Sequence, residues 1–503
     1  MGAFQRILKN LGAMFTGRAI SILQQVVLPP VFVYRYSTAL YGEWGVLSGA
    51  IGALSVLNFG VQTYMNQDLA VRFNRGETEG YHIRQSTALR LLLGIIGSGL
   101  LLCLVIFVLP LEQLLRLDIS RSAAQWTTYL LAVQVLVNIL FGYLSGIFMG
   151  VARAHRGSHW NNALALITSL GLLVGAWLRA PFPVLAAVQV LALFLCIAGV
   201  LVDLRRSAPE IFPSLRYWDG SAVRQMLKPS GYFGLITMCT FLTYQAPLIV
   251  LQRIVGPVAV AAFLVMRTVF SMCRQLLSIF TQSMGAEITN LFGRRDWPSL
   301  SKLYEYSERL IFFMIPLVNI GVLMLSPVLI TVWMHKRAEL FSIYPYVLSA
   351  AISMVLSLKE HKFQFQFSTN THVELARIMF FSYLAMVIAS VATVHFFGVM
   401  GFLWTWLAVE LFQTTNIIGL NVRLFAHIEK IEFRYLLRLG LVCVSTLFAA
   451  SFLLLRTSKF SLPGQLLTSV LSGLVVAAIV WPLFGVTAVL KMMSAKFLGR
   501  SAV

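Results

Sequence analysis

Charged residues are scarce in this chain, and their scarcity excludes an ordinary soluble domain. Asp, Glu, Lys and Arg make up only 12% of the 503 residues, whereas 58% are hydrophobic. Soluble domains carry roughly twice that charged fraction, about 25%. The apolar residues fall into runs along the whole chain, and a run of about 20 residues matches the hydrocarbon thickness of a bilayer. Since backbone groups in lipid must pair within their own segment, each run predicts a transmembrane helix.

Short motifs of enzymes and metal sites are also missing. The five cysteines fall inside apolar runs, with no Cys-x-x-Cys pair and no Cys/His cluster, which indicates buried free thiols. There is no G-x-x-x-x-G-K-[ST] loop, no H-E-x-x-H and no G-x-S-x-G. We therefore expect no catalytic residue, no metal and no cofactor, and we look for function inside the helical bundle.

Basic residues outnumber acidic ones by 39 to 19, which gives a net charge of +20. Such an excess often indicates a nucleic-acid partner, but a topological explanation fits this chain better, and we expect no nucleic acid. With both termini in the cytoplasm, the segments on that side hold more than twice as many Lys and Arg residues as the opposite loops. The positive-inside rule therefore predicts a multi-pass protein of the bacterial inner membrane with cytoplasmic N- and C-termini.

Fourteen membrane spans are expected. They lie at approximately 12–34, 40–66, 87–110, 126–151, 161–179, 183–202, 230–251, 258–285, 309–333, 342–368, 376–397, 400–425, 438–456 and 465–490. The longest hydrophilic stretch divides them six and eight. This pattern predicts an N-lobe at 1–203, a cytoplasmic linker at 204–229, a C-lobe at 230–425, and two further spans with a cytoplasmic tail at 426–503.

A weak internal repeat supports two related lobes. At an offset of about 218 residues, Pro29 aligns with Pro247 and Arg35 with Arg253. Parallel repeats are a common transporter plan, with the substrate site between the halves. The fold class predicted is thus an all-α polytopic membrane protein, with two pseudo-symmetric six-helix lobes plus two C-terminal helices.

The eighth span carries the strongest candidate site. Polar residues follow one another by four, three, four and four positions, which places them on one helical face: Arg267, Ser271, Arg274, Ser278 and Gln282. Charges within a bilayer face the bundle interior or a wet cavity and mark substrate pathways. The alternative, that the arginines reach back to the headgroups, fits poorly because Arg274 lies near the middle of the span.

The first span offers a second, weaker candidate. Arg18 and Gln25 share one face, but Arg18 lies near the cytoplasmic edge, so reaching the headgroups is a competing explanation. Pro29 and Pro30 are expected to bend this helix, and Pro247 the seventh span. The three prolines are candidate gate positions, although prolines are common in membrane helices without gating.

The end of the tenth span allows two interpretations. Lys359, Glu360 and Lys362 belong to a loop if the helix stops after the apolar run, or they project inward if it continues through 363–367. Glu360 and Glu410 are candidate coupling carboxylates, although neutralising a lysine is the simpler role. A cavity rich in guanidinium groups and poor in acids suits an anionic substrate, because arginine keeps its charge and binds phosphate in a bidentate manner.

Two segments resemble a known family. Leu40–Ala70, "LYGEWGVLSGAIGALSVLNFGVQTYMNQDLA", is similar to the second span of the polysaccharide transporter family, with a Tyr-Gly-x-Trp start and a Phe-Gly end. The segment from Ser368 to Phe412, with Gly398 and Gly401, is similar to the tenth-to-twelfth region of that family. The family, which includes O-antigen flippases, belongs to the multidrug/oligosaccharidyl-lipid/polysaccharide exporter superfamily.

The resemblance implies a flippase with a V-shaped two-lobed bundle and a cationic central cavity that opens alternately to each side. Its substrate would be an undecaprenyl-diphosphate-linked oligosaccharide for surface polysaccharide (O-antigen, capsule or exopolysaccharide) biosynthesis. Membrane lipids, a polysaccharide polymerase and chain-length proteins would be its partners. By span and face, the diphosphate ligands would be Arg18, Arg267, Arg274, Lys359 and Lys362, with Gln25, Ser271, Ser278 and Gln282 as polar lining.

Three other functions stay open at this point. An ion-coupled multidrug exporter of the same superfamily is the nearest alternative, and drug resistance on expression would favour it. A membrane-embedded glycan-transfer enzyme is a second, disfavoured by short outward loops. A structural scaffold is the third, but it leaves two arginines within one span without an explanation.

Overall fold

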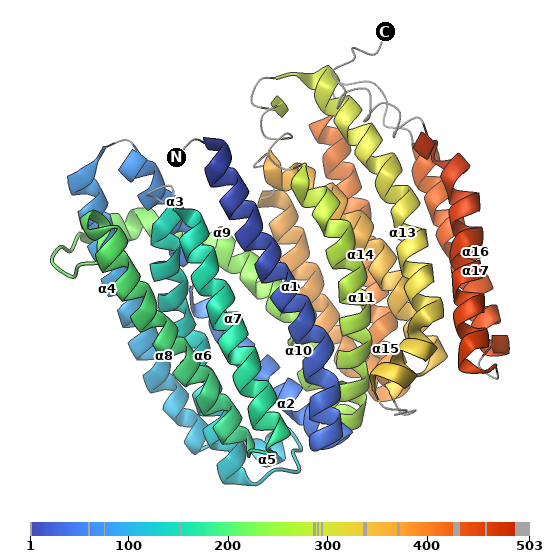
Figure 1. Cartoon of the computed structure of the whole chain (residues 1–503), viewed down its shortest axis with the longest axis horizontal. Coiled ribbons are helices and arrows are strands. Elements are labelled where there is room, and N and C mark those ends of the chain that lie inside the picture. Colours follow the sequence, from blue (N-terminus) through green and yellow to red (C-terminus); the bar gives the residue numbers. More distant parts are fainter. Residues whose placement is uncertain are drawn as a thin grey trace. The chain divides into compact units, whose positions relative to one another are not determined.

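The computed structural model describes residues 3–58, 61–74, 76–149, 153–284, 288, 291–292, 295–334, 340–369, 373–425, 433–457 and 460–487. In these ranges the regular secondary structure is entirely helical, with no strand. Nine helices among the described residues are long and apolar enough to cross a membrane. The chain is therefore an all-α polytopic membrane protein, as its hydropathy predicts (Figure 1).

Two compact units divide the chain, Met1–Ala261 and Ala262–Val503. Unit 1 contains α1 (Ala3–Arg35), α2 (Thr38–Ile51), η1 (Gly52–Asn58), α3 (Val61–Asn74), α4 (Thr78–Cys103), η2 (Leu104–Phe107), α5 (Leu111–Leu114), α6 (Arg121–Gly146), η3 (Ile147–Met149), α7 (Ala154–Trp177), α8 (Phe182–Ser207), η4 (Pro209–Ile211), α9 (Gly220–Tyr244) and α10 (Ala246–Ile254). Unit 2 contains most of α11 (Pro257–Ser283), then α13 (Trp297–Trp333), α14 (Ile343–Ser368), α15 (Val373–Leu424), α16 (Phe433–Thr457) and α17 (Leu462–Leu483).

Each of the fourteen predicted spans coincides with one helix or with adjoining helical segments. The second span is made of α2, η1 and α3, and the eleventh and twelfth together form α15. Gly398 separates these last two spans with φ 57° and ψ −142°, a conformation that a residue with a side chain avoids. The eleventh and twelfth spans are thus two helices joined by a break at Gly398.

The division between the units falls within α11. Helices α9 and α10 belong to unit 1, where α9 packs on α3 and α10 on α2. The lobe boundaries predicted from the hydrophilic stretch at 204–229 stay a prediction.

The candidate gate prolines have different surroundings. The seventh span is interrupted at Gln245, and Pro247 lies in the first turn of α10, where its missing N–H leaves no helical bond unmade. In α1, Pro29 and Pro30 lie inside a helix that runs on to Arg35. The structure thus shows the expected break in the seventh span, and the role of all three prolines as gates stays a prediction.

The outer surface of unit 2 is strongly apolar. On α16, large side chains recur at helical spacing and are between 62% and 77% exposed: Leu437, Leu441, Val444 and Phe448. Leaving such a face in water would be unfavourable, whereas lipid tails solvate it. This pattern is expected for a helix at the periphery of a membrane bundle.

Candidate functional site

The polar face predicted for the eighth span lines a cavity in unit 2. Arg267, Ser271 and Arg274 of α11 border it, together with Ser349 and Ser353 of α14. The cavity measures about 20 Å³, which is room for roughly one water molecule. Three of the five predicted residues therefore meet at one small cavity, whose remaining walls are apolar: Phe263, Met266, Phe270, Ile352, Leu356 and Trp406.

The other two residues of that face are placed differently. Ser278 is buried on α11 and donates to the carbonyl of Gln275 (2.9 Å), away from the residues that line the cavity. The side chain of Gln282 lies outside the described residues. Their predicted role as cavity lining stays a prediction.

The two arginines differ in their contacts. The guanidinium of Arg274 forms an ion pair with Glu360 at 3.4 Å, and these side chains are 14% and 35% exposed. Arg267 lies over the ring of Phe263, with 5.8 Å between the guanidinium carbon and the ring centroid. Aromatic faces attract cations, so this contact helps to hold Arg267 in place.

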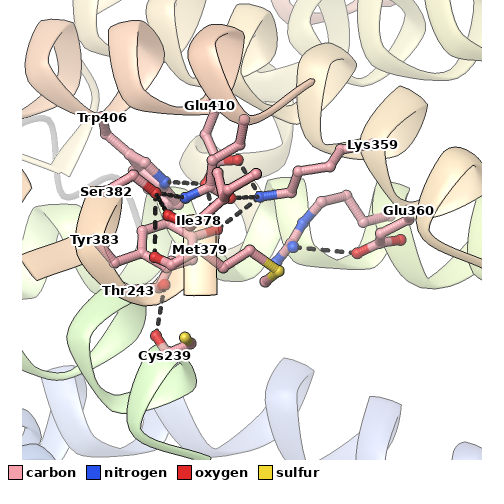
Figure 2. A network of polar contacts seen from close by, with 12 residues as sticks. Cys239, Thr243, Lys359, Glu360, Ile378, Met379, Ser382, Tyr383, Trp406 and Glu410 are labelled. Atoms are coloured by element: carbon pink, nitrogen blue, oxygen red, sulfur yellow. Dashed lines mark hydrogen bonds and ion pairs between the residues drawn. The ribbon is translucent and has the colours of Figure 1, made fainter. Parts of the chain in front are cut away.

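Helix α14 resolves the two interpretations of the tenth span. It continues to Ser368, so Lys359 and Lys362 lie within the helix and are buried. Figure 2 shows Lys359 directed toward Glu410 of α15, with which it forms an ion pair. Lys359 Nζ also donates to the Tyr383 hydroxyl (2.6 Å) and to the Gln413 amide oxygen (3.0 Å).

Glu410 is fully enclosed by donors. Besides Lys359, the Tyr383 hydroxyl (2.8 Å) and the Trp406 indole N–H (3.0 Å) donate to its Oε1. The network continues through Gln413, whose amide donates to Ser382 (2.6 Å). A buried carboxylate with three donors holds α14 and α15 together, so the neutralising role is the one that the geometry supports.

A second buried ion pair lies nearby on α14. Lys362 pairs with Glu308 of α13 and donates to the Tyr304 hydroxyl at 2.7 Å. His361 is also buried, and its Nε2 lies 2.9 Å from the Ser307 hydroxyl. Both lysines proposed as diphosphate ligands are thus engaged by carboxylates, and neither borders the cavity on α11.

Sequence reasoning missed Glu308. The predicted ninth span began at 309, which placed Glu308 in a loop, but α13 begins at Trp297 and Glu308 lies a third of the way along it. An acidic residue just before a long apolar run could have prompted the search for a buried lysine partner. The partner itself, 54 residues away, has no signature in the local sequence.

The candidates on the first span lie in unit 1. Arg18 and Gln25 of α1 are both half-buried, and the Gln25 amide donates to the Ser21 hydroxyl at 3.3 Å. Neither borders the cavity on α11, which is built from unit 2. Their predicted contact with substrate stays a prediction.

Comparisons with known proteins identify the fold. No family model matches the chain, and no curated protein matches it. Among solved structures, an inward-facing multidrug resistance MATE family transporter of the MOP superfamily has a TM-score of 0.68 at 12% identity, over 81% of this chain and 96% of that one. The inward closed lipid II flippase MurJ has a TM-score of 0.68 at 13% identity, over 95% and 99%.

A third solved structure comes from the same superfamily. It is a MOP superfamily transporter from Pyrococcus furiosus, described as having a binding pocket of reversed polarity, with a TM-score of 0.55 at 11% identity over 85% and 96% of the two chains. The chain therefore has the fold of MOP superfamily transporters. At identities this low the likeness defines the fold, and function must be argued from the site.

Proposed function

We propose that the chain is a flippase that moves an undecaprenyl-diphosphate-linked oligosaccharide from the cytoplasmic to the outer leaflet by alternating access. One observation carries the proposal: Arg267 and Arg274, on one face of a membrane helix, border the same small cavity. Two guanidinium groups a helical turn or two apart suit a diphosphate, which offers several oxygens to bidentate donors.

The balance of charge around the cavity supports an anionic substrate. No carboxylate belongs to the residues that line it, and the acids Glu308 and Glu410 are engaged by buried lysines instead. Glu360 is the acid that pairs with Arg274, and it is 35% exposed. A diphosphate would take its place, because it brings more negative charge to the same guanidinium.

The size of the cavity sets a requirement on the mechanism. At about 20 Å³ it holds a water molecule and not a diphosphate. Binding therefore needs α11 and α14 to separate around the headgroup, as alternating access provides. An inside-negative potential drives the outward step by about 2.3 kcal/mol per negative charge for each 100 mV.

The proposal includes the setting of the protein. We place the chain in the bacterial inner membrane with both termini in the cytoplasm, in accord with its distribution of Lys and Arg. A polymerase and chain-length proteins for the exported glycan are proposed partners.

A multidrug exporter is the second candidate. The likeness to a multidrug resistance MATE family transporter favours it, at the same TM-score as the lipid II flippase. The chemistry of the cavity on α11 argues against it for cationic drugs, which need an acidic site. Expression in a drug-sensitive strain distinguishes the two, because a rise in the inhibitory concentrations of several unrelated drugs would favour the exporter.

The direct test is transport in proteoliposomes, with a fluorescent undecaprenyl-diphosphate-linked oligosaccharide as substrate. The variant carrying Arg267→Ala and Arg274→Ala should lose at least about a hundredfold in rate at low substrate, because each charge-assisted hydrogen bond contributes about 1.5–3 kcal/mol. Arg423→Ala is the matched control, since Arg423 lies on the surface of α15 with its side chain 76% exposed. Undiminished flipping in the double variant would refute the proposal.

A further inference from the structure

Unit 1 contains a polar cavity of its own, about 400 Å³ in volume. Residues of η1, α3, α6 and α9 and Gln245 border it. Amides and hydroxyls from η1, α3, α9 and the break after α9 line it: Ser55, Gln62, Thr237, Thr240 and Gln245. No charged side chain belongs to this lining, in contrast to the cavity on α11.

Two further amides of the lining stand on the middle of α6. Gln134 and Asn138 are four residues apart, so they share one face of the helix. Neither side chain makes a hydrogen bond to any other residue in the part of the chain that the structure describes. Gln134 is half-buried and Asn138 is exposed at the cavity, so water or a polar ligand there can satisfy both amides, as polar groups at this position in a membrane protein require.

The donors and acceptors of the cavity match a particular chemistry. Amide side chains present both a donor and an acceptor, and hydroxyls are donor and acceptor at once. A sugar residue presents the same mixture on its hydroxyl groups. Phe241 adds an apolar ring to the lining, which suits the C–H face of a sugar. The volume lies within the range of small-molecule sites, about 300–1,000 Å³.

We propose that this cavity binds an uncharged sugar residue of the transported glycan. The inference rests on the proposed function, and it assigns recognition of the sugar to Gln134 and Asn138 of unit 1. The amides on α6 then act as specificity determinants, because a sugar that cannot satisfy them leaves them unpaired.

Binding of two lipids to the full-length protein in nanodiscs tests the assignment. The probes are undecaprenyl diphosphate and undecaprenyl diphosphate carrying N-acetylglucosamine. The wild-type protein should bind the second probe more tightly, and the variant with Gln134→Ala and Asn138→Ala should lose about tenfold or more for that probe alone. The variant with Arg267→Ala and Arg274→Ala should lose affinity for both probes equally.

Asn416→Ala is the matched control, since Asn416 is an exposed amide on α15 that donates to the carbonyl of Phe412. Retention of the sugar-dependent gain in the α6 variant would overturn the inference, as would equal affinity of the wild type for both probes. Binding of neither probe by the wild type would instead count against the proposed function.

A second measurement tests the cavity without any lipid. Val135→Cys, in a background with Cys443→Ser, introduces a thiol at the cavity and leaves Gln134 and Asn138 in place, while the four remaining native cysteines are buried. Maltose should slow the alkylation of this thiol by N-ethylmaleimide, and sodium diphosphate should not. An alkylation rate that maltose leaves unchanged, as expected for a cavity that holds water alone, would overturn the inference.

Discussion

Replacing Glu410 by Gln should destabilise unit 2 by about 3–5 kcal/mol, the usual loss when one partner of a buried ion pair is removed. Glu410 is fully buried, and Lys359 is 7% exposed. The substitution keeps the shape of the side chain but turns one of its acceptors into a donor. Lys359 would then be left as a buried ammonium without a carboxylate.

The contacts of Glu410 show why the amide cannot adapt. Oε2 accepts from Lys359, whereas Oε1 accepts from the Tyr383 hydroxyl and the Trp406 indole. In either orientation the NH₂ group of a glutamine faces a donor, the ammonium on one side or the indole N–H on the other. Lys359 retains the Tyr383 and Gln413 oxygens, which places the expected loss at the lower end of the range, about 3 kcal/mol.

The assay is the free energy of unfolding from SDS titration in mixed micelles, arranged as a double-mutant cycle. Lys359→Met combined with Glu410→Gln should cost less than the two single changes together, by about 2 kcal/mol or more. Glu374→Gln is the control, because its ion pair with Arg423 lies on the surface and contributes about 0–1 kcal/mol. A single Glu410→Gln variant as stable as the control would refute the reasoning.

The flipping rate of a further double variant separates a structural carboxylate from a coupling one. The variant with Lys359→Met and Glu410→Leu replaces the pair by apolar side chains, which often preserves stability. We expect it to fold and to flip the lipid-linked glycan at a rate close to that of the wild type. A stable variant that does not flip would show that Glu410 takes part in coupling.

Three further predictions concern single positions. Replacing Lys362 by Met leaves Glu308 buried and should destabilise unit 2 by about 3–5 kcal/mol in the SDS titration, and adding Glu308→Leu should recover most of the loss. Gly398→Ala should cost about 1–3 kcal/mol in the same titration, because φ is 57° at Gly398, and a cost near zero would contradict this. Asp219 caps α9, and hydrogen bonds from Ser221 lower its pKa. The carboxylate therefore stabilises the fold above the ordinary pKa of aspartate, and this stabilisation is lost as the pH falls through the lowered value. The midpoint of thermal unfolding should fall in acid for the wild type and fall less for Asp219→Ala.

Much of the fold follows from local sequence because the bilayer restricts what a segment can be. An apolar run of about 20 residues has to be a helix in lipid, and each of the fourteen predicted runs is mainly helical over the residues that the structure describes. The face shared by Arg267, Ser271 and Arg274 follows from the helical repeat alone, and these residues do border one cavity. Helix ends were less predictable, since a polar residue at the edge of an apolar run can extend the helix or end it.

Partnerships between helices could not be predicted from the sequence. Lys359 and Lys362 are three positions apart on α14, yet one pairs with Glu410 of α15 and the other with Glu308 of α13. The neutral lining of the unit 1 cavity is equally hidden, because its amides come from helices far apart in the chain. Composition and periodicity set where the helices lie and which residues share a face, since both depend on neighbours along the chain. Which lysine pairs with which acid depends on how the helices pack, because those contacts join residues that are 50 or more positions apart.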